Sequence, residues 1–129
     1  MHKPSTQNIL LVEDHIMVRM LAKQFLLKNG FEVDAVENGE KALLLTVEKS
    51  YDLILMDLKL PGINGFDTTK IIRALNNNNA NIPILALTSS TKDEVQEQMN
   101  EVGITDYVGK PFKSEKLLQK IHFYIFKIK

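Results

Sequence analysis

Several chemistries are ruled out by residues that the chain lacks. None of the 129 residues is cysteine, so the chain can form no disulfide and has no thiol for a zinc site or for nucleophilic catalysis. Neither sign of charge is in excess, because 16 lysine and arginine residues balance 16 aspartate and glutamate residues. We therefore expect no binding to nucleic acid by the chain itself.

Long hydrophobic segments are also missing. The apolar runs are too short to span a bilayer, and residues 1–7 are polar, unlike a secretory signal. We expect a cytoplasmic location and no membrane contact by the chain itself, although a domain taken from a membrane-anchored parent would share these features. The length and the apolar content of 44% predict one domain, residues 1–129, with residues 1–7 and the last few residues frayed.

Five short apolar runs alternate with segments in which apolar residues recur at helical spacing. We predict these runs to be β-strands: Ile9–Val12, Phe31–Ala35, Leu53–Met56, Ile82–Leu87 and Tyr107–Val108. Asn38 is predicted to cap the second helix and Ser114 the fifth, and Asn29-Gly30 is predicted to end the first helix. The Asn76–Asn79 tract is predicted to be a solvated surface loop.

This alternation predicts an α/β fold with a parallel sheet and helices on both of its faces. Ligands of such open sheets bind beyond the carboxyl ends of the strands, where the strand order reverses. Polar residues with useful chemistry follow four of the predicted strands, and we expect them to meet at this edge: Glu13, Asp14, Asp57, Thr88 and Lys110.

The five side chains have complementary chemistry. Clustered carboxylates repel each other unless a proton or a cation is present, and carboxylate oxygens are ligands that suit Mg²⁺. Phosphoryl transfer needs a nucleophile in line, a metal on the phosphoryl oxygens and a cation near the developing charge. A carboxylate can be the nucleophile and form an acyl phosphate. Asp57 is the best candidate, because it stands alone at a strand end whereas Glu13 and Asp14 form a pair.

Short motifs occur in order at the ends of the predicted strands. They are Leu11-Val12-Glu13-Asp14, the run from Met56-Asp57 to Asn64-Gly65-Phe66, Leu87-Thr88, Asp106-Tyr107 and Lys110-Pro111-Phe112. Each motif alone is weak evidence, but together they make the chain resemble the receiver domain of two-component response regulators over essentially its full length. The segments Met56 to Gly65 and Ile82 to Thr88 are more similar in sequence to receivers of hybrid histidine kinases. The resemblance implies a flavodoxin-like (βα)5 fold with strand order 2-1-3-4-5.

The resemblance also implies roles for the acidic residues. Asp57 matches the aspartate that accepts the phosphoryl group and also binds the metal. Asp14 matches a direct Mg²⁺ ligand, and Glu13 matches an acid that supports the metal through water. The backbone carbonyl of Lys59 matches a further metal ligand.

Three other residues match the parts that respond to phosphorylation. Lys110 matches the lysine that pairs with the phosphoryl group, and the bond between Lys110 and Pro111 is cis in the family. Thr88 matches the hydroxyl that binds a phosphoryl oxygen, and Tyr107 matches the aromatic residue whose rotamer follows. Ser89 stands where alanine or glycine is usual, and Lys59 and Ser90 stand at variable positions that tune the lifetime of the acyl phosphate.

The function implied is that of a signalling domain rather than an enzyme with a substrate of its own. A histidine kinase or a histidine phosphotransfer protein would donate the phosphoryl group to Asp57. The surface of the fourth helix, fifth strand and fifth helix would then change and be read by a partner. The chain is either a stand-alone receiver or the receiver of a larger hybrid kinase.

Competing functions fit the residues less well. A phosphatase of the haloacid dehalogenase type needs a second aspartate two positions after the first, where this chain has Lys59. A flavin mononucleotide binder would want a phosphate loop after the first strand, where Glu13 and Asp14 would repel a phosphate. A degenerate receiver that serves only as a binding module would lack one of the five key residues.

Two further features are open at the level of sequence. His15 lies beside the acids and is predicted to face solvent rather than bind metal. His2 and His122 have no evident partners in the sequence and are predicted to lie on the surface. The segment from His122 to Lys129 is denser in aromatic residues than one buried helix face needs. Either these residues cover the core, or the surplus docks a second copy or a neighbouring domain.

Overall fold

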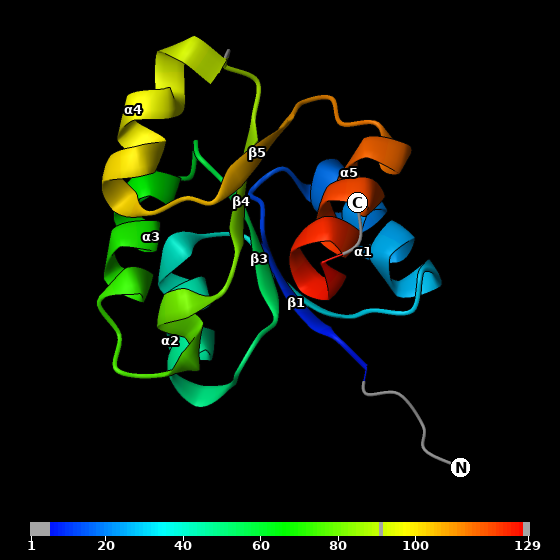
Figure 1. The fold of residues 1–129 in the computed structure, drawn as a ribbon, viewed down its shortest axis with the longest axis horizontal. Helices are drawn as coiled ribbons and strands as arrows, with labels where there is room; N and C mark the ends of the chain where they lie inside the picture. The colour runs from blue at the N-terminus through cyan, green and yellow to red at the C-terminus, as the bar shows by residue number, and fades with distance from the viewer. Residues whose placement is uncertain (1–5, 91, 128–129) are drawn as a thin grey trace.

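The chain folds as a parallel sheet between two layers of helices (Figure 1). The computed structural model describes residues 6–90 and 92–127. The strands are β1 (Asn8–Val12), β2 (Glu32–Val36), β3 (Leu53–Asp57), β4 (Ile84–Thr88) and β5 (Asp106–Gly109). The helices are α1 (Ile16–Lys28), α2 (Gly39–Glu48), α3 (Gly65–Arg73), α4 (Lys92–Val102) and α5 (Ser114–Phe126), with a 3₁₀ turn η1 (Asn78–Asn81).

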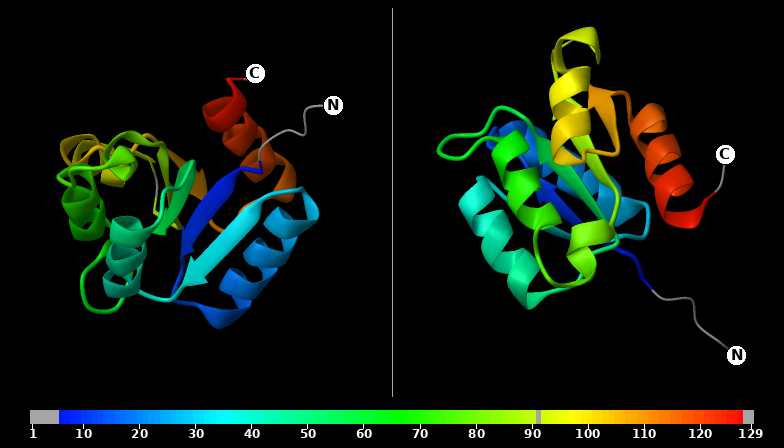
Figure 2. Two further views of the ribbon diagram at one scale, coloured as in Figure 1. Left: turned by 90° about the horizontal axis from the view of Figure 1, so that it is seen from below. Right: turned by 60° about the vertical axis from the view of Figure 1, so that its left-hand side comes forward.

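The strand order β2-β1-β3-β4-β5 confirms the predicted flavodoxin-like fold. Every neighbouring pair is parallel. Because the order reverses between β1 and β3, the connections leave these two strands toward opposite faces and open a crevice at their carboxyl ends. Helices α2, α3 and α4 cover one face and α1 and α5 the other, as the turned views also show (Figure 2).

The central strands are buried on both faces, so their side chains feed two separate cores. One core joins alternate strand residues to α2, α3 and α4, and it includes Leu10, Val12, Ile54 and Met56. The other joins the intervening residues to α1 and α5, and it includes Ile9, Leu11, Leu53 and Leu55. Burying each such side chain stabilises the fold by about 1.5–3 kcal/mol. The strand ends that carry the polar residues are therefore firmly anchored.

The strand limits differ slightly from the predicted ones, for reasons of hydrogen bonding. Phe31 is buried, but its N–H donates to the Leu26 carbonyl at 3.2 Å and closes the end of α1, so β2 starts at Glu32. Pro83 has no N–H for the ladder, and β4 starts at Ile84.

The helix ends agree with the prediction in two places and not in a third. Asn38 caps α2, with its Oδ1 accepting the Lys41 N–H at 2.8 Å. Gly30 follows the end of α1 with a φ of 93°, a conformation that favours glycine. The prediction that Ser114 caps α5 is wrong, because Ser114 is already the first helical residue. Lys113 holds the cap position and makes no side-chain cap bond.

The prediction of a solvated loop at Asn76–Asn79 is wrong for Asn79. Its side chain is 1% exposed, and its Oδ1 accepts the Tyr51 N–H at 2.9 Å. Its Nδ2 donates to the Thr46 carbonyl at 2.8 Å and to the Lys49 carbonyl at 2.7 Å. The side chain thus ties η1 to the end of α2 and to the chain that leads into β3.

Two predictions concern the ends of the chain and the membrane. Fraying was predicted for residues 1–7 and the last few residues, and most of these, residues 1–5 and 128–129, lie outside the described part. His2 is among them. Within the described ranges, none of the helices has the length and apolar character needed to cross a bilayer.

Candidate functional site

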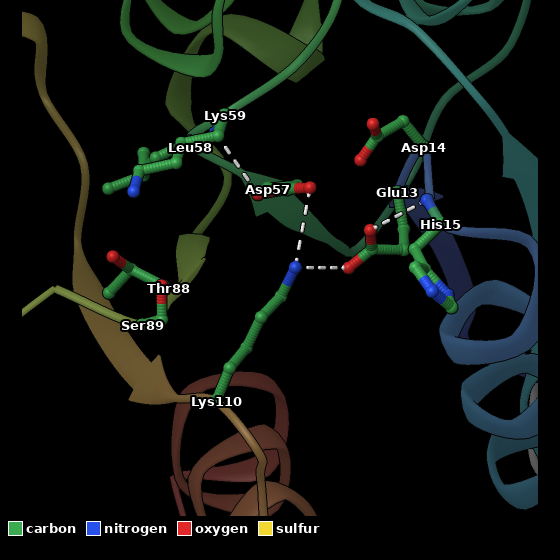
Figure 3. Close-up of a pocket in the computed structure, with 9 residues that line it drawn as sticks. All are labelled: Glu13, Asp14, His15, Asp57, Leu58, Lys59, Thr88, Ser89 and Lys110. Atoms are coloured by element: carbon green, nitrogen blue, oxygen red, sulfur yellow. Dashed lines mark hydrogen bonds and ion pairs between the residues drawn. The ribbon is translucent and has the colours of Figure 1, made fainter.

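The five predicted site residues meet in one cleft at the carboxyl edge of the sheet (Figure 3). Asp57 is the last residue of β3 and Thr88 the last of β4, while Glu13 follows β1 and Lys110 follows β5. The cleft has a volume of about 300 Å³. Its full lining is Glu13, Asp14, His15, Asp57, Leu58, Lys59, Thr88, Ser89 and Lys110.

Three carboxylates surround one space in this cleft. Oxygen atoms of Glu13, Asp14 and Asp57 all lie within 4.8 Å of one another. Glu13 is 0% exposed and Asp57 is 3% exposed, whereas Asp14 is exposed. Charged groups withdrawn from water this far need a proton, a cation or hydrogen bonds to offset the loss of hydration.

Lys110 supplies one positive charge to the cluster. Its Nζ lies 2.6 Å from Glu13 Oε1 and 3.3 Å from Asp57 Oδ2. Burial alone would lower the pKa of Lys110, but the two carboxylates outweigh burial and raise it. The Lys110–Pro111 peptide bond is cis, as the resemblance implied, and the Lys110 N–H donates to the Thr88 carbonyl at 2.7 Å.

The single ammonium of Lys110 does not balance the negative charge of the three carboxylates. Lys110 brings one positive charge to three carboxylates, and two of these, Glu13 and Asp57, are buried. Burial, followed by the neighbouring Glu13 carboxylate, raises the pKa of Asp57 to about 7. Both observations indicate an excess of negative charge that a further cation would relieve.

The backbone that follows β3 is shaped to present Asp57. The Lys59 N–H donates to Asp57 Oδ1 at 3.1 Å, and the Leu58 N–H donates to the Leu87 carbonyl at 3.3 Å. Gly65 begins α3 directly beside this turn, with its N–H donating to the Leu58 carbonyl at 3.1 Å. A Cβ atom at Gly65 would lie 2.3 Å from the Asp57 carbonyl oxygen, so only glycine fits.

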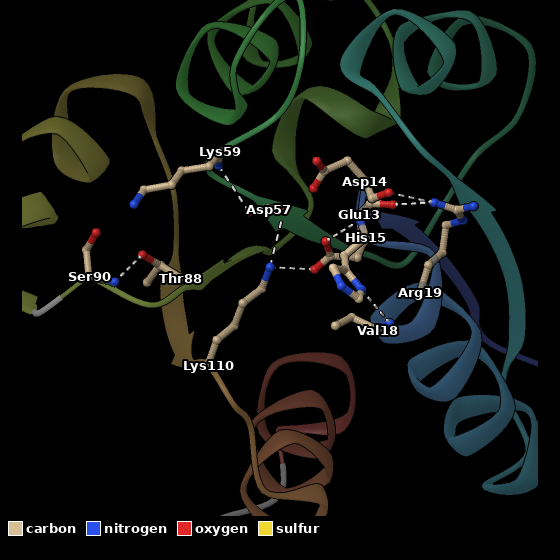
Figure 4. Close-up of polar contacts among 10 residues, drawn as sticks. All are labelled: Glu13, Asp14, His15, Val18, Arg19, Asp57, Lys59, Thr88, Ser90 and Lys110. Carbon is tan, nitrogen blue, oxygen red and sulfur yellow. Dashed lines mark hydrogen bonds and ion pairs between the residues drawn. The ribbon is translucent and has the colours of Figure 1, made fainter.

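Thr88 lies on the opposite side of the cleft from Glu13 and Asp14, with Asp57 between them (Figure 4). It is 4% exposed, and its Oγ1 accepts the Ser90 N–H at 3.0 Å. A hydroxyl that accepts one hydrogen bond can still donate its own proton. Thr88 can therefore offer a donor to an oxygen atom that enters the cleft.

Tyr107 lies in β5, outside the lining of this cleft. Its ring is half-buried against the core under α2, α3 and α4. Lys120 Nζ lies 5.0 Å from the centre of this ring and donates to the Tyr107 carbonyl at 2.9 Å. The ring is thus held from the side of α5.

Neither His15 nor His122, the two histidines within the described ranges, adds a side chain to the group of carboxylates. His15 is exposed, as predicted, and caps α1, with its Nδ1 accepting the Val18 N–H at 3.4 Å. Its backbone N–H donates to Glu13 Oε2 at 3.0 Å, a contact that the sequence did not reveal. His122 has partners that the sequence did not make evident, because its ring packs 6.1 Å from Phe31 and 5.6 Å from Phe126.

Part of the aromatic C-terminal segment covers the core, and docking of the remainder to a second copy or a neighbouring domain stays a prediction. Ile121 is buried, while Tyr124 and Ile125 pack partly buried against the core. Phe123 and Phe126 remain 38% and 43% exposed. Lys129 lies outside the described residues.

The donor set fits a hard divalent cation. Three carboxylates offer oxygen atoms around one space, and the single ammonium of Lys110 balances only one of their charges. Oxygen ligands that include carboxylates are the preferred environment of Mg²⁺. Glu13, Asp14 and Asp57 are the side chains that would hold the ion.

Comparison with known proteins decides the family. The model of the response regulator receiver domain matches residues 9–122. The chain belongs to this family. The transcriptional regulatory protein ResD of Bacillus subtilis is 31% identical over 121 residues, which cover 94% of this receiver and 49% of ResD. This receiver spans about half or less of the length of the curated relatives it matches.

Two solved receiver structures are similar to this receiver throughout. One is the receiver domain of sensor histidine kinase PA1611 of Pseudomonas aeruginosa, with a magnesium ion coordinated in its active site cleft. It is 34% identical with a TM-score of 0.87, over 95% of this chain and 99% of that one. The other is the Ssk1 receiver of Saccharomyces cerevisiae in complex with the histidine phosphotransfer protein Ypd1. It is 28% identical with a TM-score of 0.86, over 94% of this chain and 90% of that one.

Proposed function

We propose that this receiver domain accepts a phosphoryl group on Asp57 from a phosphohistidine of a partner protein. The observation that carries the proposal is the position of Asp57, a buried carboxylate at a strand end that faces Lys110 across a cleft shared with Glu13, Asp14 and Thr88. The partner would be a histidine kinase or a histidine phosphotransfer protein. The Ypd1 complex of a similar receiver supports this class of donor.

The reaction is a transfer between two nucleophiles. An oxygen of the Asp57 carboxylate forms a bond to phosphorus, and the bond from phosphorus to the imidazole nitrogen of the donor breaks. The nitrogen keeps the electron pair of that bond, and Asp57 becomes an acyl phosphate. The Lys59 N–H, which donates to Asp57 Oδ1 at 3.1 Å, orients the carboxylate so that Oδ2 faces the cleft.

The cleft also has groups for the charge that arrives. When bound by Glu13, Asp14, Asp57 and the Lys59 backbone carbonyl, Mg²⁺ would neutralise the carboxylates and the phosphoryl oxygens. Lys110, already 3.3 Å from Asp57, pairs with a phosphoryl oxygen. The Thr88 hydroxyl donates a hydrogen bond to another phosphoryl oxygen. Together these groups stabilise the charge that develops during the transfer.

The same contacts provide a route to a signal. Movement of Thr88 toward the phosphoryl group would vacate the space that its side chain fills, and Tyr107 would turn inward into that space. The surface formed by α4, β5 and α5 then differs between two states whose populations phosphorylation shifts. A homodimer mate or a neighbouring domain would read this surface. We propose one receiver domain over residues 1–129, acting in the cytoplasm on its own or within a hybrid histidine kinase.

The proposal implies a signalling domain that catalyses only its own phosphorylation and dephosphorylation. Profiling tests it: histidine kinases and histidine phosphotransfer proteins, each carrying a labelled phosphohistidine, are mixed with the receiver and Mg²⁺. We expect label to move rapidly to the wild type from at least one donor and not to Asp57→Asn. Equal labelling of both proteins would contradict the assignment of Asp57.

A further inference from the structure

The turn that carries the two adjacent acids is held from behind by an arginine (Figure 4). Arg19 lies in the first turns of α1, and its Nη1 donates to the Glu13 carbonyl at 2.9 Å and to the Asp14 carbonyl at 3.2 Å. Both carbonyls lie beyond the last residue of β1. One guanidinium nitrogen therefore bridges consecutive carbonyls that the sheet no longer pairs.

The position of the guanidinium fixes which way the acids point. In Figure 4 it lies on the side of the turn away from Asp57 and Lys110, while the two carboxylates face the cleft. The Glu13 N–H donates to the Val36 carbonyl at 3.0 Å, and Glu13 Oε2 accepts the His15 N–H at 3.0 Å. With its amide, carbonyl and carboxylate all bonded, Glu13 has little freedom. Asp14 is exposed, and the bond from Arg19 to its carbonyl helps to orient its backbone.

We propose, on the basis of the function proposed above, that Arg19 is a positioning residue for the divalent cation. It touches neither the reacting atoms nor the carboxylates. By bonding the carbonyls of Glu13 and Asp14, it holds the turn in the one conformation in which both side chains reach the cation. Residues that orient metal ligands in this way commonly change metal affinity when they are removed.

This role predicts an effect opposite in sign to that of simple electrostatics. Arg19 carries a positive charge near the site of a dication, and the repulsion between them disfavours binding. If charge were its only contribution, Arg19→Met would bind Mg²⁺ more tightly than the wild type. If Arg19 positions the turn, Arg19→Met binds Mg²⁺ more weakly.

The test measures the dissociation constant for Mg²⁺ by isothermal titration calorimetry on four proteins. They are the wild type, Arg19→Met, Arg19→Lys and the control Lys23→Met, which removes the same charge from the same helix. We expect Arg19→Met to weaken binding on the order of ten-fold. Arg19→Lys keeps the charge but is too short to bridge both carbonyls, so we expect it to weaken binding as well. Lys23→Met should bind Mg²⁺ like the wild type.

Phosphorylation by acetyl phosphate gives a second readout. The Mg²⁺ concentration for half-maximal rate should rise in Arg19→Met by the same factor as the dissociation constant, with a smaller change in the maximal rate. Unchanged or tighter binding in Arg19→Met, or wild-type binding in Arg19→Lys, overturns the role of Arg19 and leaves the proposed function intact. A wild type that binds no Mg²⁺ would overturn both. If Arg19→Met does not fold in the presence of EDTA, the Mg²⁺ dissociation constant of Arg19→Lys tests the role of Arg19 instead.

Discussion

The ammonium of Lys110 lies closer to Glu13, at 2.6 Å, than to Asp57, at 3.3 Å. The cation that we expect to meet the phosphoryl group therefore compensates Glu13, an acid that we propose to support the metal, before any phosphoryl group arrives. Since Glu13 is 0% exposed, this contact replaces part of the hydration that the carboxylate loses on burial. Cation binding at Glu13 would release Lys110 from this role and leave it available to Asp57. The two positive charges of the mechanism are thus coupled through one buried carboxylate.

Replacing Lys110 should affect both chemistry and stability. Without its ammonium, the charge on the transferring group is less stabilised, and we expect phosphorylation of Lys110→Met by acetyl phosphate to slow by roughly 100-fold. Glu13 would also be left buried without its partner, so the protein should melt at a lower temperature in EDTA and recover partly in Mg²⁺. Lys113→Met, at an exposed position in the same loop, serves as the control. A rate for Lys110→Met equal to that of the control would show that Lys110 has no such role.

The pKa of Asp57 predicts how stability depends on pH in the absence of a cation. It is about 7 in the folded chain against an ordinary 3.8, chiefly because of burial and then because of Glu13. Between these values the folded state keeps a proton that the unfolded state loses, so the free energy of unfolding falls as pH rises. The slope would be at most about 1.4 kcal/mol per pH unit. Urea titrations in EDTA across this range measure it.

The substitution Asp57→Asn removes the titrating group and should flatten this dependence. Asp34 and Asp106 do not contribute to this slope, because the pKa of each lies below the ordinary value. Burial raises the pKa of both groups, but hydrogen bonds, including those from Lys49 to Asp34 and from Tyr124 to Asp106, outweigh burial. Their contributions to the free energy of unfolding therefore change at pH values below 3.8, outside the range in which Asp57 acts. Asp67→Asn, an exposed change of the same kind, should keep the wild-type slope. Stability of the wild type that stays constant or rises with pH would contradict a protonated Asp57.

The two residues that follow Glu13 should differ sharply in their effect on metal binding. Asp14→Ala removes one of the three carboxylates around the site and should weaken Mg²⁺ binding strongly. His15→Ala should leave binding nearly unchanged, because its imidazole caps α1. It should instead lower the free energy of unfolding by about 1 kcal/mol. Calorimetric titration with Mg²⁺ and urea unfolding separate the two effects. Equal losses of affinity would make His15 a ligand.

Neighbouring asparagines in η1 should differ just as clearly in stability. Asn79→Ala leaves the Lys49 carbonyl and the Tyr51 N–H without this partner, while the Thr46 carbonyl keeps the bond from Asn77 Nδ2, and the change should destabilise the chain by about 3 kcal/mol. Asn78→Ala, at an exposed position, should change stability by less than about 0.5 kcal/mol. Urea unfolding measures both. Similar values for the two variants would mean that the buried hydrogen bonds of Asn79 contribute little.

The sequence predicts most of the fold because the strand signal is strong in this chain. Apolar runs that end on Asp57 or Thr88 locate buried parallel strands, and parallel strands bring their carboxyl ends to one edge. The limits of β2 and β4 were missed by one or two residues, since they depend on which partner the Phe31 N–H finds and on the missing N–H of Pro83. Local hydrogen bonding, rather than hydrophobic pattern, decides such details.

Other parts of the site could not be predicted because their signals are not local. The ion pair of Lys110 with Glu13 joins residues 97 positions apart whose side chains meet only in the folded sheet. Arg19 looks like any charged residue on an amphipathic helix until its bonds to two carbonyls are seen. Asn79 looks like its exposed neighbours for the same reason. In each case the partner is a backbone group or a distant side chain, which composition and spacing do not reveal.

The most direct test of the account is phosphorylation of the purified chain by acetyl phosphate, read as intact mass. We predict that the wild type gains one phosphoryl group in Mg²⁺ and none in EDTA, and that Asp57→Asn gains none in either. Reduction of the acyl phosphate with borohydride, followed by peptide mass spectrometry, should place the modification at Asp57. An unmodified wild type beside a competent control receiver, or a phosphoryl group on another residue, would contradict the account.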